Sequence, residues 1–285
     1  MAIPRVLTIA GSDSGGGAGI QADIKTITMM GGHGMSAITA ITAQNTLRVL
    51  QVMPVPTDMV LAQIDAVVGD IGVDAIKIGM IGTAQTAEAV ADRLRRADLS
   101  AVPVVFDPVM VASTGARLAD QATMLSFTRL MSRAAVSTPN LDELQALSNM
   151  RVDDEIAIGD AAAHLIEDRG SGPILATGAR LPGGKIIRAG QPDASGDDYL
   201  FDLLFCEDEG WQETSWHAAR IDTDGDHGTG CTLSSAIAVG LGAGLPLREA
   251  IDRARNYVRA ALLAAPGLGK GRGPMGHGLG QTHFP

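Results

Sequence analysis

The chain alternates short apolar runs with longer stretches in which apolar residues return at the spacing of an α-helix. In the stretch that starts at Asp58, for example, Val60, Ile64 and Val67 fall on one face of a helix. The helical stretches cover residues 19–30, 58–69, 83–96, 121–132, 141–148 and 158–169, and the apolar runs that predict strands cover 6–10, 35–42, 75–78, 102–106, 135–137 and 174–176. Because strands and helices alternate through short loops, the pattern predicts an α/β fold: a mostly parallel sheet with helices on both faces.

The pattern changes beyond Gly178. Two segments, residues 199–205 and 211–221, flank an acidic turn at 207–210 and predict a β-hairpin at one edge of the sheet. Two further helices are expected over 229–242 and 247–265, followed by an irregular glycine-rich tail over 267–285. No internal repeat or linker divides the chain, so we expect one domain over residues 1–285.

Composition narrows the class of protein. The 285 residues are 46% hydrophobic, enough for a large core, and their net charge of −10 argues against a nucleic-acid-binding surface. Two cysteines, Cys206 and Cys231, are too few for a disulfide framework, and from the first residues we expect no signal peptide. No apolar run approaches the roughly 18 residues of a membrane span. We therefore expect a cytoplasmic protein without a membrane partner.

Glycines and polar residues follow the predicted strands. In a sheet of this kind, ligands bind beyond the carboxyl ends of the strands. The residues at those positions are, in chain order, 11–19, Gln44 and Asn45, Gly79 and Met80, Asp107 and Pro108, Pro139 and Asn140, and Thr177 and Gly178. The sequence therefore predicts one ligand site at this edge of the sheet.

The first of these segments, residues 11–19, is a glycine-rich turn between a strand and a helix. Residues 17–22 fit the dinucleotide-binding pattern with Ala in the last place, but no acidic residue follows between Asp23 and Asp58. The phosphate-binding pattern that requires Gly-Lys before Ser or Thr is also absent, because Ile186 follows Lys185 and Gly271 follows Lys270. The turn is therefore neither of the standard nucleotide loops, and an NAD-linked oxidoreductase is excluded.

A second glycine turn, His227-Gly-Thr-Gly-Cys231, opens a long helix of small residues. The first amides of a helix have no partner within it, and its dipole places positive charge there, so this end is suited to bind phosphate. The same field favours the thiolate of Cys231. The alternative interpretation is a turn that only caps a buried helix.

Three further positions are candidates for chemistry. Carboxylates at Asp107 and Glu143 could share a Mg²⁺ ion, or could serve only as a turn cap and a first-turn acid. The carboxamide of Gln44 both donates and accepts, as an aminopyrimidine edge requires, although turn amides often bond their own backbone. Asp23 could point into the mouth of the site or be an ordinary helix acid.

Six segments together resemble the hydroxymethylpyrimidine/phosphomethylpyrimidine kinases of thiamine biosynthesis. They cover residues 7–26, 34–46, 77–82, 107–112, 138–143 and 227–235, and they occur in the family's order. The resemblance implies a three-layer ribokinase-like fold and two ATP-dependent phosphorylations, first of 4-amino-5-hydroxymethyl-2-methylpyrimidine and then of its monophosphate. It also implies Mg²⁺ and a homodimer.

The resemblance assigns roles by position. It implies that Cys231 stands where related sugar kinases carry an aspartate base, and that the amides of Gly228, Thr229 and Gly230 stabilise the transferring phosphoryl group. The remaining implied sites are Gln44, Gly11, Asp23, Met80 and Val109 for the pyrimidine, Asn140, Thr177 and Gly178 for the nucleotide, and Asp107 and Glu143 for the metal.

The sequence departs from the family at three cationic or imidazole positions. Ser113 stands where a lysine is common, Thr177 opens a segment that usually begins with lysine, and Arg272 replaces a tail histidine. Arg180, Lys185 or Arg272 could supply the missing charge. Two alternatives remain: a pyridoxal kinase of the same superfamily, and a non-catalytic pyrimidine-binding regulator that has lost phosphoryl transfer.

Overall fold

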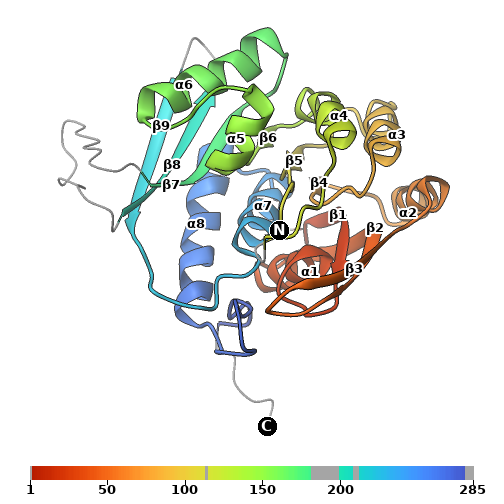
Figure 1. Cartoon of the computed structure of the whole chain (residues 1–285). Coiled ribbons are helices and arrows are strands. Elements are labelled where there is room, and N and C mark those ends of the chain that lie inside the picture. Colours follow the sequence, from red (N-terminus) through yellow and green to blue (C-terminus); the bar gives the residue numbers. More distant parts are fainter. Residues whose placement is uncertain (1, 113–114, 181–198, 208–211, 280–285) are drawn as a thin grey trace.

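A computed structural model describes residues 2–112, 115–180, 199–207 and 212–279 of the chain. Within them a nine-stranded sheet has the order β3-β2-β1-β4-β5-β6-β7-β8-β9 (Figure 1). The strands are β1 (Arg5–Asp13), β2 (His33–Gln44), β3 (Val49–Pro54), β4 (Ala75–Ile78), β5 (Val104–Phe106), β6 (Val136–Ser137), β7 (Ile174–Ala179), β8 (Tyr199–Cys206) and β9 (Gln212–Ala219). In sheet order, the six neighbouring strands β2-β1-β4-β5-β6-β7 pair in parallel. The pairs β3-β2, β7-β8 and β8-β9 toward the two edges are antiparallel.

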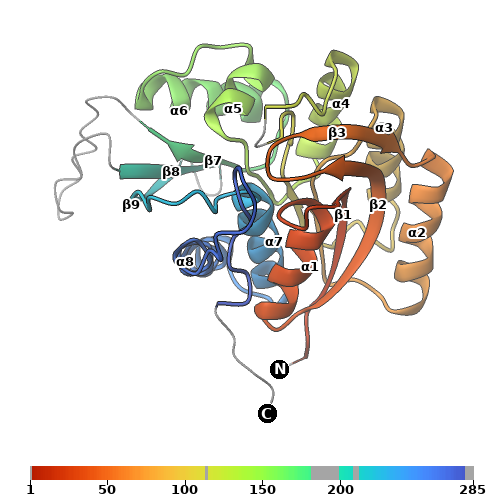
Figure 2. The same ribbon diagram turned by 60° about the horizontal axis from the view of Figure 1, so that its bottom comes forward.

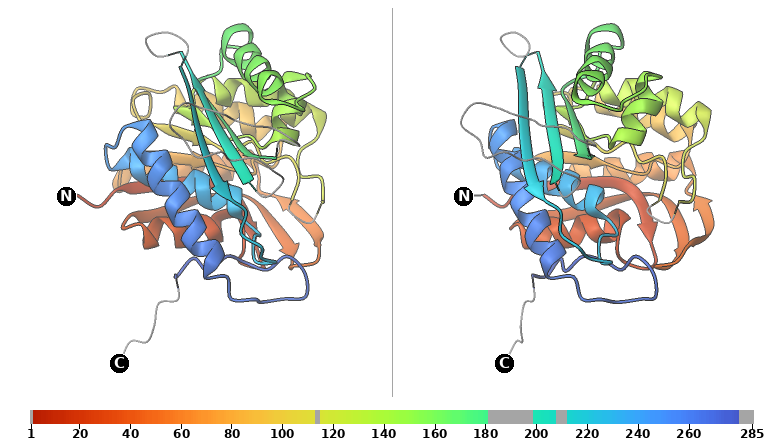
Figure 3. Two further views of the ribbon diagram at one scale, coloured as in Figure 1. Left: turned by 90° about the vertical axis from the view of Figure 1, so that its left-hand side faces the viewer. Right: turned by 60° about the vertical axis from the view of Figure 1, so that its left-hand side comes forward.

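Helices cover both faces of the sheet, as the alternating pattern predicts (Figure 3). They are α1 (Gly19–Met29), α2 (Thr57–Asp70), α3 (Ala84–Leu94), α4 (Gln121–Met131), α5 (Leu141–Ser148), α6 (Glu155–Ala163), α7 (Thr229–Gly242) and α8 (Leu247–Leu263), and a π-helical turn, η1 (His164–Asp168), extends α6. Neighbouring strand residues enter opposite cores: Leu7 belongs to the core that includes side chains of α2 to α6, and Val6 belongs to the core that includes side chains of α1, α7 and α8. The predicted three-layer fold is therefore present.

Helix α7 lies in the middle of its layer, and its residues from Thr232 to Gly240 are all buried. Its small side chains allow close packing, since a Cβ built on Gly240 would lie 2.7 Å from the Cβ of Ala250 in α8. No helix in the described part of the chain is long and apolar enough to cross a membrane.

The edge hairpin of β8 and β9 forms as predicted, but strand β3 at the opposite edge was missed. Most β3 residues are exposed, so their hydrophobic pattern does not alternate and carries no strand signal. The first strand is also longer than predicted: residues 11–13 continue β1, so that only 14–18 form the loop before α1.

The segment after α8 contains no helix or strand as far as residue 279, yet it is packed against the molecule (Figure 2). It passes beside the start of α7, where Pro274 forms a β-bridge with His227. The buried ring of His277 bonds the hydroxyl of Thr232 through Nε2 at 2.9 Å, and the hydroxyl of Tyr257 donates to the His277 carbonyl at 2.8 Å. Of this segment, Arg272 reaches the cavity that the next section describes.

Candidate active site

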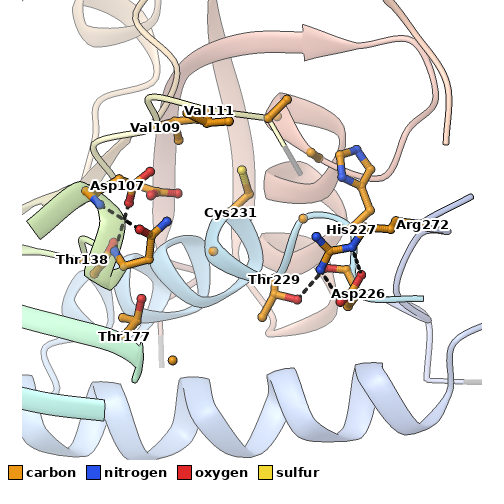
Figure 4. Close-up of a pocket in the computed structure, with 18 of the residues that line it drawn as sticks. Asp107, Val109, Val111, Thr138, Thr177, Asp226, His227, Thr229, Cys231 and Arg272 are labelled. Carbon is orange, nitrogen blue, oxygen red and sulfur yellow. Dashed lines mark hydrogen bonds and ion pairs between the residues drawn. The ribbon is translucent and has the colours of Figure 1, made fainter. Parts of the chain in front are cut away.

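A cavity of about 610 Å³ opens at the carboxyl ends of the parallel strands, next to the N-terminus of α7 (Figure 4). Of the residues that the sequence predicts for the site, all except Asp23 line it. They are Gly11, Gln44, Met80, Asp107, Val109, Asn140, Glu143, Thr177, Gly178, Gly228, Thr229, Gly230 and Cys231. Segments from six strand ends and one helix terminus thus meet at one place, as the strand-end argument predicts.

The glycine-rich loop of residues 14–18 is organised around the carboxylate of Asp13. That carboxylate accepts hydrogen bonds from the amides of Gly15, Gly17 and Ala18 at 2.8, 3.0 and 2.9 Å. Burial by itself raises the pKa of Asp13, but bonds from His227 and from the loop amides outweigh it and lower the pKa below its ordinary value. These loop amides therefore hold a carboxylate of the protein and are not available to a phosphate.

Gln44 ends β2 and is tied to the start of α7. Its amide nitrogen lies 3.0 Å from Nε2 of His227, and Nε2 lies 3.2 Å from the Asp13 carboxylate. Because Gly228 follows His227 directly, Gln44 stands beside the helix terminus. The pairing spans 183 residues of sequence, and it brings a group able to hold a small polar ring next to a group able to hold phosphate.

The terminus of α7 has the form of an anion site. Gly228 has a φ of 87°, and a Cβ there would lie 2.0 Å from the carbonyl oxygen of Gly17. Only glycine fits this position. Among the described residues, no group accepts a hydrogen bond from the amide of Gly230 or of Cys231. These two amides remain for a ligand, and the helix dipole adds positive charge to them.

Cys231 lies on the first turn of α7 and faces the cavity (Figure 4). The expected thiolate is not supported: desolvation by surrounding atoms raises the pKa of Cys231 to about 12. The positive charge of Lys77 lowers this pKa and the charges of Asp23 and Asp107 raise it, both by less than burial does. At neutral pH the side chain is therefore a thiol, despite its place at a helix N-terminus.

Asp107 and Glu143 are buried carboxyls with raised pKa values. Burial raises the pKa of Asp107 to about 6, although Lys77 opposes the shift. Burial and the nearby charge of Asp107 raise the pKa of Glu143 to about 8. Glu143 also forms a capping box, since its Oε2 accepts from the Asn140 amide at 3.0 Å and the Asn140 Oδ1 accepts from its amide at 2.9 Å.

The prediction that Asp23 contacts the substrate needs correction. Asp23 is completely buried and forms an ion pair with the equally buried Lys77, at 2.9 and 3.0 Å. The hydroxyls of Thr8 and Ser235 donate to it at 2.5 and 2.8 Å. With these partners Asp23 lies beneath the cavity wall, where it joins α1, β1, β4 and α7.

Asn140, Thr177 and Gly178 line the cavity, which four arginines also line. Asn140 and Thr177 form a β-bridge, and Gly178 has a φ of 64°. The arginines that line the cavity are Arg180, Arg220, Arg259 and Arg272. Two of the three candidate replacement cations, Arg180 and Arg272, are thus at the cavity, whereas Lys185 and the departure at Ser113 lie outside the described residues.

Sequence reasoning missed several residues that line the site, chiefly Asp13, His227, Arg220 and Arg259, and it missed Lys77 beneath the cavity wall. Asp13 had a detectable signal, because an Asp before a run of glycines commonly accepts hydrogen bonds from the following amides. Lys77 also had a detectable signal, because a lysine within an apolar strand requires a buried counter-charge. The role of His227 had no local signal, because both of its side-chain partners are distant in sequence.

Sequence comparison places the chain among known kinases. The family model for phosphomethylpyrimidine kinase matches residues 13–276. A hydroxymethylpyrimidine/phosphomethylpyrimidine kinase of Streptomyces coelicolor is 45% identical over 276 residues, which cover 96% of this chain and 94% of the relative. A kinase of the same description from Rhizobium meliloti is 44% identical over 274 residues, covering 95% and 96%.

Solved structures agree in fold. The pyridoxal kinase of Bacillus subtilis, in an ADP complex, matches with a TM-score of 0.82 and 32% identity over 98% of each chain. A phosphomethylpyrimidine kinase of Clostridium difficile 630 matches with a TM-score of 0.73 and 30% identity, over 90% of this chain and 99% of that one. The predicted ribokinase-like fold is confirmed, and the family match over most of the sequence shows that the chain belongs to the phosphomethylpyrimidine kinase family.

Proposed function

We propose that this chain transfers the γ-phosphoryl group of ATP to the hydroxymethyl group of 4-amino-5-hydroxymethyl-2-methylpyrimidine, and then a second phosphoryl group to the monophosphate. The observation that carries this proposal is the contact between Gln44 and His227, which sets a carboxamide beside the open amides of α7. A pyrimidine held by Gln44 would have its hydroxyl near the site where phosphate binds. The curated relatives carry the names of kinases for these two substrates.

In the proposed reaction the substrate hydroxyl oxygen forms a bond to the γ-phosphorus, the bond from that phosphorus to the bridging oxygen breaks, and ADP leaves. Such transfers pass through a loose transition state and gain most of their rate from stabilisation of charge. The amides of Gly230 and Cys231 are suited to supply it. Cys231 would accept the hydroxyl proton, a smaller contribution because its thiol must first ionise.

Asp107 and Glu143 fit a role in holding Mg²⁺. Both carboxyls hold protons more tightly than usual, and part of the cause for Glu143 is the charge of Asp107, so a cation between or beside them would relieve that repulsion. The described residues contain no cluster of three or more His, Cys, Asp or Glu side chains placed for a metal. Mg²⁺ commonly binds one or two carboxylates together with water and substrate phosphates, so two carboxyls suffice. When bound, the ion would neutralise phosphate charge.

The direct test is to incubate purified protein with ATP, Mg²⁺ and the hydroxymethylpyrimidine and to look for the mono- and diphosphate. We expect both products. Lack of any phosphorylated product at high enzyme concentration would contradict the proposal. Calorimetry then separates a non-catalytic regulator, which would bind the pyrimidine but not ATP.

Pyridoxal phosphorylation is a second candidate. The pyridoxal kinase of Staphylococcus aureus, in complex with AMP-PCP and pyridoxal, matches with a TM-score of 0.82 and 30% identity over 98% of this chain and 95% of that one. Turnover of pyridoxal and of the pyrimidine, measured side by side, decides between the two substrates.

Exposed apolar side chains at the β3 edge of the sheet support a homodimer. Ile41, Leu50 and Met53 of β2 and β3 are 46%, 58% and 54% exposed, and Met59 of α2 is 54% exposed. A cluster of this kind commonly marks an interface. We expect sedimentation to give twice the mass of the chain and Leu50→Lys to reduce it. Cytoplasmic location is proposed from the two cysteines, which form no disulfide with each other.

A further inference from the structure

The buried imidazole of His227 contacts two polar groups through a single nitrogen. The residue is 4% exposed, and its Nε2 lies 3.2 Å from Asp13 Oδ2 and 3.0 Å from the amide nitrogen of Gln44. Its other nitrogen, Nδ1, has no hydrogen-bond partner among the described residues. One ring nitrogen cannot donate to a carboxylate and accept from an amide N–H at the same time. The position of the ring proton therefore decides how the Gln44 amide must lie.

The surroundings place that proton on Nε2. Asp13 already accepts from three backbone amides and stays ionised, so it can only accept from His227. A proton on Nδ1 instead would be a buried donor without an acceptor, which is costly. His227 is therefore a donor at Nε2.

Thr42, the second neighbour of the Gln44 amide, leads to the same orientation. The hydroxyl of Thr42 donates its only proton to the carbonyl oxygen of Ser12 at 2.9 Å. Toward Gln44, 3.4 Å away, it can only accept. His227 thus requires the amide oxygen and Thr42 requires the amide nitrogen. Half a turn of the terminal amide satisfies both and changes no packing, because the two ends have the same shape.

We propose that His227 is a positioning residue that holds the Gln44 carboxamide with its oxygen toward Nε2–H. The amide hydrogen that Thr42 does not take is then left for the substrate. The inference rests on the proposed function and deepens it: the cavity demands a ring nitrogen that accepts, as an aminopyrimidine offers, and disfavours a ring that presents a protonated nitrogen at that point.

The imidazole is also fixed mechanically. The His227 amide donates to the Gly273 carbonyl at 3.1 Å, so the tail holds the backbone. The ring packs under the glycine-rich loop, where a Cβ on Gly17 would lie 2.5 Å from its Cδ2. Because the tail holds the backbone and the glycine-rich loop lies against the ring, we expect the orientation of Gln44 to be set before substrate binds.

The kinetic test compares His227→Leu, which fills the space without a donor, with His227→Gln, which restores an N–H group. We expect His227→Leu to raise KM for the pyrimidine about tenfold and KM for ATP less than about twofold, because one misdirected hydrogen bond accounts for a factor of this size. His227→Gln should recover most of the loss. In a Gln44→Ala background His227→Leu should add no further increase, because its effect passes through Gln44.

His277 provides a matched control. It is a second buried histidine, bonded to Thr232 and outside the cavity lining. His277→Leu should lower the melting temperature and leave KM for the pyrimidine unchanged. Equal increases in both KM values on His227→Leu, or the same increase with Gln44 absent, would overturn the proposal.

A second measurement needs no variant. Imidazole ¹⁵N chemical shifts of the wild-type protein show which ring nitrogen carries the proton. We expect the Nε2–H form for His227, and the Nδ1–H form would overturn the proposal even if His227→Leu fails to fold. This result does not depend on catalysis, so lack of pyrimidine turnover would reject the proposed function without deciding how Gln44 lies.

Discussion

The two ends of the cavity differ in how far their polar groups are satisfied. At the Gln44 end, Asp13 has four hydrogen-bond donors around it and its pKa is low. At the α7 end, the amides of Gly230 and Cys231 have no acceptor among the described residues, and the pKa values of Asp107, Glu143 and Cys231 are all raised. At the first end the fold itself satisfies the Asp13 carboxylate and fixes the Gln44 amide. The polar groups of the second end find their partners only when a charged ligand binds. The rigid first end is therefore suited to select the substrate, and the unpaired groups of the second end are suited to stabilise phosphoryl transfer.

The largest expected effect is on stability, and it concerns the buried ion pair of Lys77 and Asp23 beneath the cavity wall. Lys77→Met leaves the Asp23 charge unpaired, which should reduce the free energy of unfolding by about 3–5 kcal/mol. Chemical denaturation measures it. The double variant with Asp23→Asn should regain most of the loss, and a loss that persists there would show that packing, not charge, is responsible.

A change at the α7 end comes next. Gly228→Ala would push a Cβ against the Gly17 carbonyl and displace the anion turn, so turnover should fall by about 10²–10³-fold. Gly244→Ala is the control, because Gly244 also has a positive φ, 82°, but nothing lies within 4 Å of the added Cβ. It should lose only stability. Similar turnover in both variants would show that the α7 amides do not contribute to the reaction.

Cys231→Ala tests whether the thiol accepts a proton. We expect turnover to fall by about 10²-fold with KM for the pyrimidine unchanged, and turnover of the wild type to rise with pH as the thiol ionises. Cys206→Ala, in β8 and outside the cavity lining, serves as the matched variant. Unaltered turnover in Cys231→Ala would exclude Cys231 as the base. The helix amides would then be the groups at this end of the cavity that contribute to catalysis.

The smallest expected effect concerns pH and stability. Because the pKa of Glu143 is raised from 4.5 to about 8 in the folded protein, the folded state binds the extra proton between these values. Its contribution to stability is full below pH 4.5 and is lost as pH rises through about 8. Glu143→Gln keeps the cap and removes this loss, so above pH 8 it should be more stable than wild type by at least about 1.4 kcal/mol, one pKa unit.

Thermal unfolding across pH measures the effect, with Asp142→Asn as the exposed neighbour for comparison. Mg²⁺ should stabilise the wild type more than Glu143→Gln if both carboxyls help to hold it. A pH slope that stays the same in Glu143→Gln would mean that another group carries the proton.

Much of the fold follows from local pattern because its strands are buried on both faces. Val104–Phe106 reads as a strand from its apolar run alone. Val49–Pro54 does not, because it is an exposed edge strand held by hydrogen bonds to β2. The helix boundaries agree within two residues, except that α6 begins at Glu155, three residues before the predicted start, and that η1 forms the last part of this predicted helix.

The site was predictable as a place and less so as a set of contacts. Strand ends fix where Gln44, Asp107 and Asn140 emerge, whatever their partners. Whether Asp23 meets ligand or lysine depends on a partner 54 residues away, and the protonation of Cys231 depends on burial that a helix terminus does not reveal. Long-range pairing and desolvation are both properties of the assembled fold.

The bridge between His227 and Pro274 has a consequence for how the protein matures. Strand β1 and its glycine loop are synthesised long before the residues beside them in the fold, because Arg272 lines the same cavity and Gly273 and Pro274 bind the backbone of His227. A nascent chain that ends at α8 contains every strand of the sheet but lacks Arg272 and the anchor for His227. Competence to bind substrate would therefore appear only after the segment that follows α8 has been made.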